Sequence, residues 1–286
     1  MKKNNSKSRS ELIATVLAYA FLIALAVVII FPFISALCAS FKTNQEILVS
    51  PKLIPEKWQI KNYIDAWNKA NFATYTWNSV WYSALSVIIA IFTSTVGGYV
   101  FSRGEFRGKN VIFAVFTSLM FITLGTSSMY PQIQILKLLH LNTSLAGLLV
   151  MQFFGINITN VFLVRGFVNS LPKSLDEAAE IDGCSFIKIF FIIILPLLKP
   201  IIATVGIFAF SAAWNDYLMP MVVTLANPAQ RPLSVGMIAL KGSSDAATAW
   251  NLILAGGMIS AIPMIIVFLM FNKYFIKGLT AGAVKG

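Results

Sequence analysis

Six blocks of apolar residues, separated by polar segments, organise the chain. They cover residues 12–37, 77–101, 111–129, 143–164, 190–213 and 251–271. An α-helix needs about 20 mostly apolar residues to cross the hydrocarbon core of a bilayer, and each block has roughly that length or more. The pattern therefore predicts an all-α, polytopic membrane protein with six transmembrane helices, in a single domain that covers residues 1–286.

The first block follows a short basic segment that contains Lys2, Lys3, Lys7 and Arg9. Its apolar run, interrupted by Pro32, is longer than the 7–15 residues of a signal-peptide core. We therefore expect a retained first transmembrane helix, with a cleavable signal peptide as the alternative.

The polar segment from Ala39 to Thr76 contains a short amphipathic pattern. Ile64, Trp67 and Phe72 stand among charged residues over 60–72. This spacing is typical of a helix that lies at a membrane interface. A packed external loop is equally compatible with the pattern.

Charge and composition agree with a membrane protein. Only 12% of residues are charged, about half the fraction of roughly 25% found in soluble domains. The formal net charge is +11, but the basic residues are spread between the apolar blocks rather than gathered on one face. The chain therefore does not resemble a nucleic-acid-binding protein, and we expect membrane lipid around it.

The distribution of Lys and Arg predicts the orientation in the membrane. With both termini inside, 14 Lys and Arg face the cytoplasm and eight face outward. Cytoplasmic loops are normally richer in basic residues. We expect cytoplasmic N- and C-termini, a cytoplasmic loop over 165–189 and a cytoplasmic tail over 272–286.

Catalytic and metal-binding patterns are missing from the sequence. There is one histidine, His140, and the two cysteines, Cys38 and Cys184, are expected on opposite sides of the membrane. No Walker sequence and no Ser/His/Asp set is present. The predicted spans hold almost no ionisable residues, and Asp216 lies just outside the fifth. We therefore expect no enzyme activity, no metal and no cofactor in this chain, and an energy source in another subunit.

A dense group of acids lies between Pro172 and Pro200. Ser174 and Glu177 have the spacing of a capping box, which predicts a helix that begins at Leu175. Gly183 is placed to end that helix, and Ser185 to cap a second helix that Pro196 and Pro200 bend or end. The acids either dock a basic partner or only complete these caps, and the two roles are compatible.

This segment resembles the EAA loop of permease subunits in bacterial ATP-binding-cassette importers. The resemblance is carried by Glu177-Ala178-Ala179, Asp182-Gly183 and Leu195-Pro196. The tail from Lys277 to Gly286 and the segment Trp214-Asn215-Asp216-Tyr217 are similar to the carbohydrate-uptake, maltose-type branch, in particular the shorter of its two paired permeases.

The resemblance implies an importer that works by alternating access and binds ATP and Mg²⁺ in partner subunits. The implied partners are a second related permease, two ATPase subunits and an extracytoplasmic sugar-binding protein that meets the loop around 227–245. The acidic helix would be the coupling helix that contacts the ATPase, through Asp176, Glu177, Ala178, Ala179, Glu180, Asp182 and Gly183. The tail would contact the ATPase through Gly278, Thr280, Gly282 and Lys285.

Substrate contacts are predicted from side-chain chemistry. Sugars bind aromatic faces and hydrogen-bonding side chains, so the candidates are Asn157, Asn160, Trp214, Asn215 and Tyr217. Each of them can instead be an interfacial anchor or a packing residue. An importer of another solute, such as an amino acid or glycerol phosphate, and a non-transporting membrane scaffold are the alternative functions.

Overall fold

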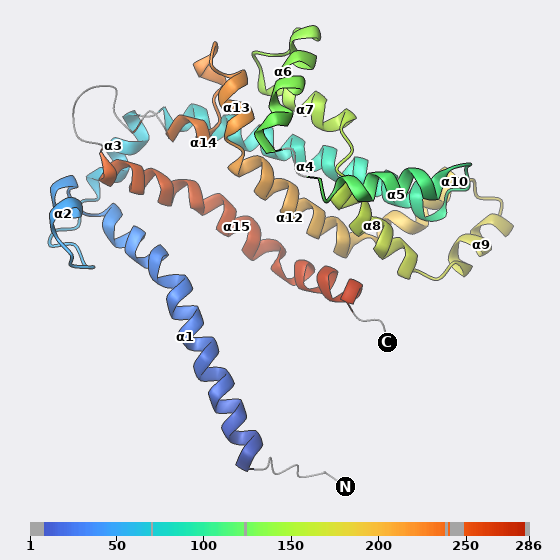
Figure 1. Cartoon of the computed structure of the whole chain (residues 1–286), viewed down its shortest axis with the longest axis horizontal. Coiled ribbons are helices and arrows are strands. Elements are labelled where there is room, and N and C mark those ends of the chain that lie inside the picture. The colour runs from blue at the N-terminus through green and yellow to red at the C-terminus, as the bar shows by residue number, and fades with distance from the viewer. Residues whose placement is uncertain (1–8, 70, 123–124, 238–239, 241–248, 284–286) are drawn as a thin grey trace. The chain divides into compact units, whose positions relative to one another are not determined.

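The chain consists of helices and connecting loops. The computed structural model describes residues 9–69, 71–122, 125–237, 240 and 249–283, and no strand occurs in this part of the chain (Figure 1). The helices form two compact units, Met1–Ala70 with Ala239–Ile259, and Asn71–Ile238 with Ser260–Gly286. The prediction of an all-α fold is confirmed.

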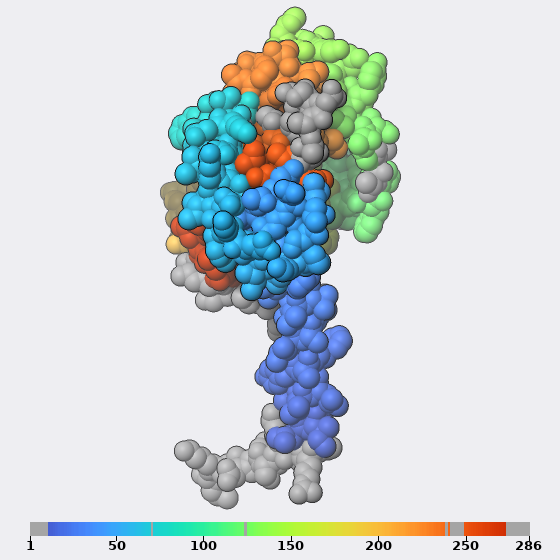
Figure 2. Space-filling view, turned by 90° about the vertical axis from the view of Figure 1, so that its left-hand side faces the viewer, coloured from blue at the N-terminus to red at the C-terminus, as the bar shows by residue number. Residues whose placement is uncertain are grey.

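The first unit contains the long helix α1 (Arg9–Ser40), the short helices α2 (Asn44–Val49) and α3 (Lys61–Lys69), and the first turns of α15 (Trp250–Ala283). Helix α1 continues through Pro32. Its apolar side chains are exposed on all sides, from Leu12 to Leu37, and Figure 2 shows them in dark blue. A helix that is apolar all round requires lipid or another protein around it.

Asn62 joins the elements of the first unit. Its Nδ2 donates to the carbonyls of Ser40 (2.9 Å) and Lys42 (2.8 Å), and its Oδ1 accepts from Asn251 Nδ2 at 2.8 Å. The pattern over 60–72 forms a helix, α3, only from Lys61 to Lys69, and Phe72 begins α4. Helix α3 turns Asn62 and Ala66 inward and leaves Ile64 exposed.

The second unit is built around α4 (Phe72–Arg103), a helix of 32 residues. Helices α8 and α12 make extensive contacts with it. The other elements of the unit, besides the end of α15, are α5 (Lys109–Leu119), η1 (Gly125–Ser128), α6 (Met129–Leu138), α7 (Leu145–Phe154), α8 (Ile158–Ser170), α9 (Ser174–Ile181), α10 (Phe186–Ile189), η2 (Phe190–Ile194, a π-helix), α11 (Leu195–Leu197), α12 (Lys199–Asn215), α13 (Leu218–Val223), η3 (Pro228–Gln230) and α14 (Leu233–Gly236).

Three described helices are long and apolar enough to cross a membrane: α1, α4 and the Trp250–Asn272 part of α15. The number rises to five if α7 with α8, bent by 44°, and α10–α11 with α12, bent by 79°, each form one broken span. In the segment predicted as a span over 111–129, the described residues form α5 up to Leu119, then the 3₁₀ turn η1 (Gly125–Ser128) and the first residue of α6. A polytopic membrane protein is confirmed, whereas the count of six spans stays a prediction.

Close packing of α4 against α8 depends on two glycines. A Cβ atom on Gly98 would lie 2.5 Å from Val164 Cγ1 and 2.9 Å from the backbone nitrogen of Arg165. A Cβ atom on Gly97 would lie 3.1 Å from Val161 Cγ2. Small residues let membrane helices approach closely, because their association relies on van der Waals packing. The distance between α4 and α8 therefore depends on this contact, and so does the position at which the loop after α8 begins.

Candidate functional site

The acidic segment forms a short helix, α9, between α8 and α10. Its first backbone N–H groups are satisfied by main-chain carbonyls: Pro172 O accepts from Leu175 N (3.3 Å), and Lys173 O accepts from Asp176 N (2.9 Å) and Glu177 N (3.1 Å). The predicted capping box is wrong, because Ser174 is itself helical and no side chain caps the helix at Lys173. A side-chain cap needs an extended backbone at the cap residue, whereas Lys173 already has helical φ and ψ angles of −64° and −25°.

The end of α9 and the start of α10 agree with the predictions. Gly183 has φ +78°, Cys184 N donates to Ala179 O (2.9 Å), and Gly183 N donates to Glu180 O (3.0 Å). This is a Schellman arrangement, in which a residue in the left-handed conformation ends the helix. Ser185 Oγ then accepts from Lys188 N at 3.4 Å and caps α10.

One face of α9 is fixed to the rest of the second unit by an ion pair. Arg103, the last residue of α4, donates from Nε to Asp176 Oδ2 at 2.9 Å and from a terminal nitrogen to the carbonyl of Leu171 at 2.8 Å. The two side chains are only 8% and 12% exposed. Ala179 is buried one turn further along, in a cluster that includes Tyr99 and Phe190.

Tyr99 provides a second attachment between α4 and this loop. Its hydroxyl donates to the Phe186 carbonyl at 3.1 Å, and its ring lies 4.5 Å from the Phe186 ring and 5.1 Å from the Phe190 ring, measured between centroids. Neither Arg103 nor Tyr99 was among the predicted site residues. One indication of the Arg103 contact was available in the sequence, because the predicted topology places Arg103 in a loop on the same side of the membrane as the acids.

The opposite face of α9 is exposed. Glu177, Ala178, Glu180, Asp182 and Gly183 lie there, and Ile181 is 86% exposed. The seven predicted coupling residues therefore divide into two groups. Asp176 and Ala179 contact their own chain, and the other five are exposed; three of these five, Glu177, Glu180 and Asp182, form the acidic surface of α9.

The predicted tail contacts lie at the end of the described chain. Gly278, Thr280 and Gly282 belong to the last turns of α15, and Lys285 lies outside the described residues. The helix extends well past the predicted span end at residue 271, up to Ala283.

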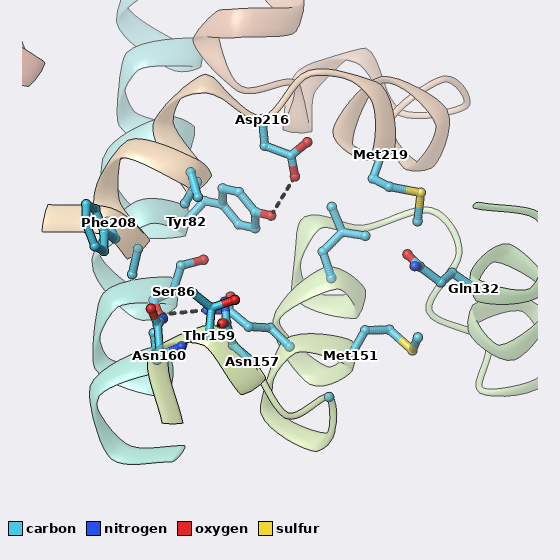
Figure 3. Close-up of a pocket in the computed structure, with 17 residues that line it drawn as sticks. Tyr82, Ser86, Gln132, Met151, Asn157, Thr159, Asn160, Phe208, Asp216 and Met219 are labelled. Atoms are coloured by element: carbon cyan, nitrogen blue, oxygen red, sulfur yellow. Dashed lines mark hydrogen bonds between the residues drawn. The ribbon is translucent and has the colours of Figure 1, made fainter. Parts of the chain in front are cut away.

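A second feature of this unit is a pocket of about 730 Å³ that is lined by residues of α4, α6, α7, α8, α12 and α13 (Figure 3). Tyr82 donates from its hydroxyl to Asp216 Oδ2 at 3.3 Å, and Gln152 Nε2 donates to the Ser86 carbonyl at 2.9 Å. Burial raises the pKa of the Asp216 carboxyl, while hydrogen bonds from Tyr82 and from the Tyr217 backbone oppose that rise.

Two of the five predicted substrate residues line this pocket. Asn160 is buried in its wall, and Asn157 caps α8 by accepting from Asn160 N at 3.1 Å. Trp214, Asn215 and Tyr217 do not line it. Trp214 is buried and donates from Nε1 to the Ser260 carbonyl at 3.0 Å, and Asn215 donates to the Ser211 carbonyl at 2.9 Å. Of the segment 214–217, only Asp216 lines the pocket, and it was not among the predicted substrate residues.

Residues 72–281 match the family described as binding-protein-dependent transport system inner membrane component. Among curated proteins, the arabinooligosaccharides transport system permease AraQ of Halalkalibacterium halodurans is 32% identical over 100% of both chains. The trehalose/maltose transport system permease MalG of Thermococcus litoralis is 33% identical over 97% of this chain and 99% of its own.

A solved structure of a bacterial ABC transporter involved in the import of the acidic polysaccharide alginate contains a chain of the same fold. Its TM-score is 0.81, with 24% identity, 94% of this chain covered and 99% of that chain covered. The family description places the protein in the cytoplasmic membrane, in a transport system that includes a binding protein. The chain belongs to the family of inner membrane components, or permeases, of binding-protein-dependent ABC transport systems.

Proposed function

We propose that the chain is a permease subunit of an ATP-driven importer that moves a sugar or oligosaccharide by alternating access. Support comes from the relatives named for arabinooligosaccharide and trehalose/maltose transport, which match along nearly the whole chain. Its partners would be a second related permease, two ATPase subunits that bind ATP and Mg²⁺, and an extracytoplasmic sugar-binding protein. Both termini and the α9 loop would face the cytoplasm.

The observation that carries the coupling role is the two-sided character of α9. Its inner face is tied to α4 through Asp176 and Arg103. Its outer face presents Glu177, Glu180 and Asp182 to solvent. Exposed carboxylates form strong hydrogen bonds with Arg and Lys of a partner, and we assign that partner to the ATPase. ATP-driven movement of the ATPase would then displace α9 and, through the ion pair, the rest of the unit.

The proposed function is tested by reconstituting the complete transporter in proteoliposomes with its binding protein. Uptake is measured for maltose, raffinose and arabinotriose, and for an amino acid and glycerol phosphate. ATP-dependent uptake of a sugar is expected. Uptake of only a non-sugar solute would overturn the sugar assignment, and purification of the chain without ATPase subunits would favour a scaffold.

Replacing Glu177 with alanine is expected to lower sugar uptake and transport-coupled ATP hydrolysis about tenfold, because one charge-assisted hydrogen bond contributes roughly 1.5–3 kcal/mol. Membrane insertion and the folding stability of the permease itself should not change, since Glu177 is exposed and makes no cap. The matched control is Glu105→Ala, which removes an exposed acid from the loop after α4. Unchanged uptake by Glu177→Ala at normal expression would contradict the coupling role.

The tail is proposed to contact the ATPase through Gly278, Thr280, Gly282 and Lys285. Deletion of Gly278 to Gly286 is expected to weaken complex assembly and to lower the ATPase rate. Copurification with the ATPase and the rate per complex are the measurements. If neither changes, the tail is a solvated end without a role in coupling.

A further inference from the structure

The pocket shown in Figure 3 lies far from the coupling end of the second unit. Tyr82 and Arg103 are both on α4, and at 1.5 Å per residue they are separated by about 32 Å along the helix axis. Helix α8 runs from the pocket, at Asn160, to Ser170 just before α9. The pocket is therefore placed on the half of the unit opposite to the acidic surface of α9.

The lining of the pocket suits hydroxyl groups. Four amide side chains contribute to it, from Gln132, Gln152, Asn157 and Asn160. Each amide offers N–H donors and a carbonyl acceptor, and a sugar hydroxyl can pair with either because it also donates and accepts. Apolar side chains such as Phe208 and Met151 complete the walls. The volume also lies in the range of about 300–1,000 Å³ that is typical of small-molecule sites.

The charge of the lining discriminates between classes of sugar. Asp216 contributes a carboxylate, and none of the lining residues is Lys, Arg or His. An anionic ligand would lose its hydration here and meet a like charge without a compensating cation, which is costly. Because the Asp216 carboxylate already accepts from the Tyr82 hydroxyl and the remaining polar groups are neutral, the pocket fits an uncharged ligand best.

We propose that this pocket contacts the transported sugar and favours uncharged oligosaccharides over those that carry uronic acid carboxylates. The inference rests on the proposed function and adds a contact site and a substrate class to it. A chain of the same fold occurs in a transporter involved in the import of an acidic polysaccharide. The fold alone therefore does not determine the charge of the transported sugar, and we attribute the selection in this chain to the lining, with Asp216 as its charged residue.

The test uses the complete transporter in proteoliposomes with maltose, raffinose and arabinotriose as probes, and compares Asn160→Ala and Asp216→Asn with the wild type. Both variants should move roughly tenfold less sugar per ATP hydrolysed, as expected for the loss of about one hydrogen bond, while ATP hydrolysis stimulated by the binding protein is retained. The control is Asn215→Ala, next to Asp216 but outside the pocket, which should transport normally.

Charge selection is tested on the same complex without its binding protein, by saturation-transfer NMR. The transported neutral sugar should give a signal that Asn160→Ala abolishes, and digalacturonate should give none. A stronger signal from digalacturonate, unchanged transport in both variants, or an equal fall in uptake and ATP hydrolysis would overturn the inference and leave the proposed function intact. Failure of the wild type to import any of the three sugars would overturn the proposed function, and this inference with it.

Discussion

Asp176→Ala is expected to destabilise the permease by about 3 kcal/mol or more and to abolish coupled transport. The substitution leaves the Arg103 guanidinium buried without its carboxylate partner, and breaking a buried pair from one side typically costs about 3–5 kcal/mol. It also removes the ion pair between α9 and α4, although the hydrogen bond from Arg103 to the Leu171 carbonyl and the packing of Ala179 in the cluster with Tyr99 remain. Thermal unfolding of the detergent-solubilised complex and ATP-dependent uptake are the measurements.

The matched comparison for this prediction is Glu177→Ala, the neighbouring acid on the exposed face. It should lower transport at normal stability, whereas Asp176→Ala should lower both. A double variant, Arg103→Leu with Asp176→Leu, should recover much of the stability, because an apolar pair can replace a buried ion pair at little cost. Equal unfolding temperatures for Asp176→Ala and the wild type would contradict a structural role for the pair.

Gly98→Leu is expected to prevent assembly of a stable permease. Even the Cβ atom would lie 2.5 Å from Val164 Cγ1, 2.7 Å from Val164 Cβ and 2.9 Å from the Arg165 backbone nitrogen. The obstacle is partly backbone, so a change of rotamer cannot remove it, and α8 must move away from α4. Overpacking of this kind costs about 1–3 kcal/mol or more. The yield of monodisperse complex after purification measures the effect.

Other glycines give a graded series for this experiment. Gly206→Ala should be tolerated, since its Cβ would lie 3.7 Å from Ile91 Cδ1, an ordinary contact. Gly97→Ala, at 3.1 Å from a flexible Val161 methyl, should be intermediate. Adding Val164→Ala to Gly98→Ala should restore only part of the yield, because the Val164 Cβ and the Arg165 nitrogen remain. Normal yield of Gly98→Leu would show that close approach of α4 and α8 is not required.

The regular features of the fold were predictable from local pattern. Long apolar runs gave the positions of α1, α4 and α15, and the chemistry of Gly183 and Ser185 gave the end of α9 and the start of α10. These features depend on a few neighbouring residues. The break of 79° before Lys199 was indicated by Pro196 and Pro200, but its size depends on packing against α4.

Features that depend on tertiary contact could not be predicted. The acids of α9 look alike in sequence, and only the position of Arg103 distinguishes Asp176 from Glu177. The Ser174 capping box failed because the turn at Pro172 and Lys173 already supplies main-chain acceptors. In the segment 214–217, α12 ends at Asn215 and the extended backbone at Asp216 decides which side chain enters the pocket, a local geometry that the sequence does not determine.

Helix α4 has a mechanical consequence for the protein. One end carries Arg103, which holds α9, and a position about 32 Å away along the helix axis carries Tyr82, which contacts Asp216. If α9 couples to an ATPase as proposed, its displacement would move α4 through Arg103, and because α4 is one continuous helix, the same displacement would reach Tyr82. Under the proposed coupling role, a displacement of α9 would therefore change the length of the hydrogen bond between the Tyr82 hydroxyl and Asp216 Oδ2, at the other end of the unit.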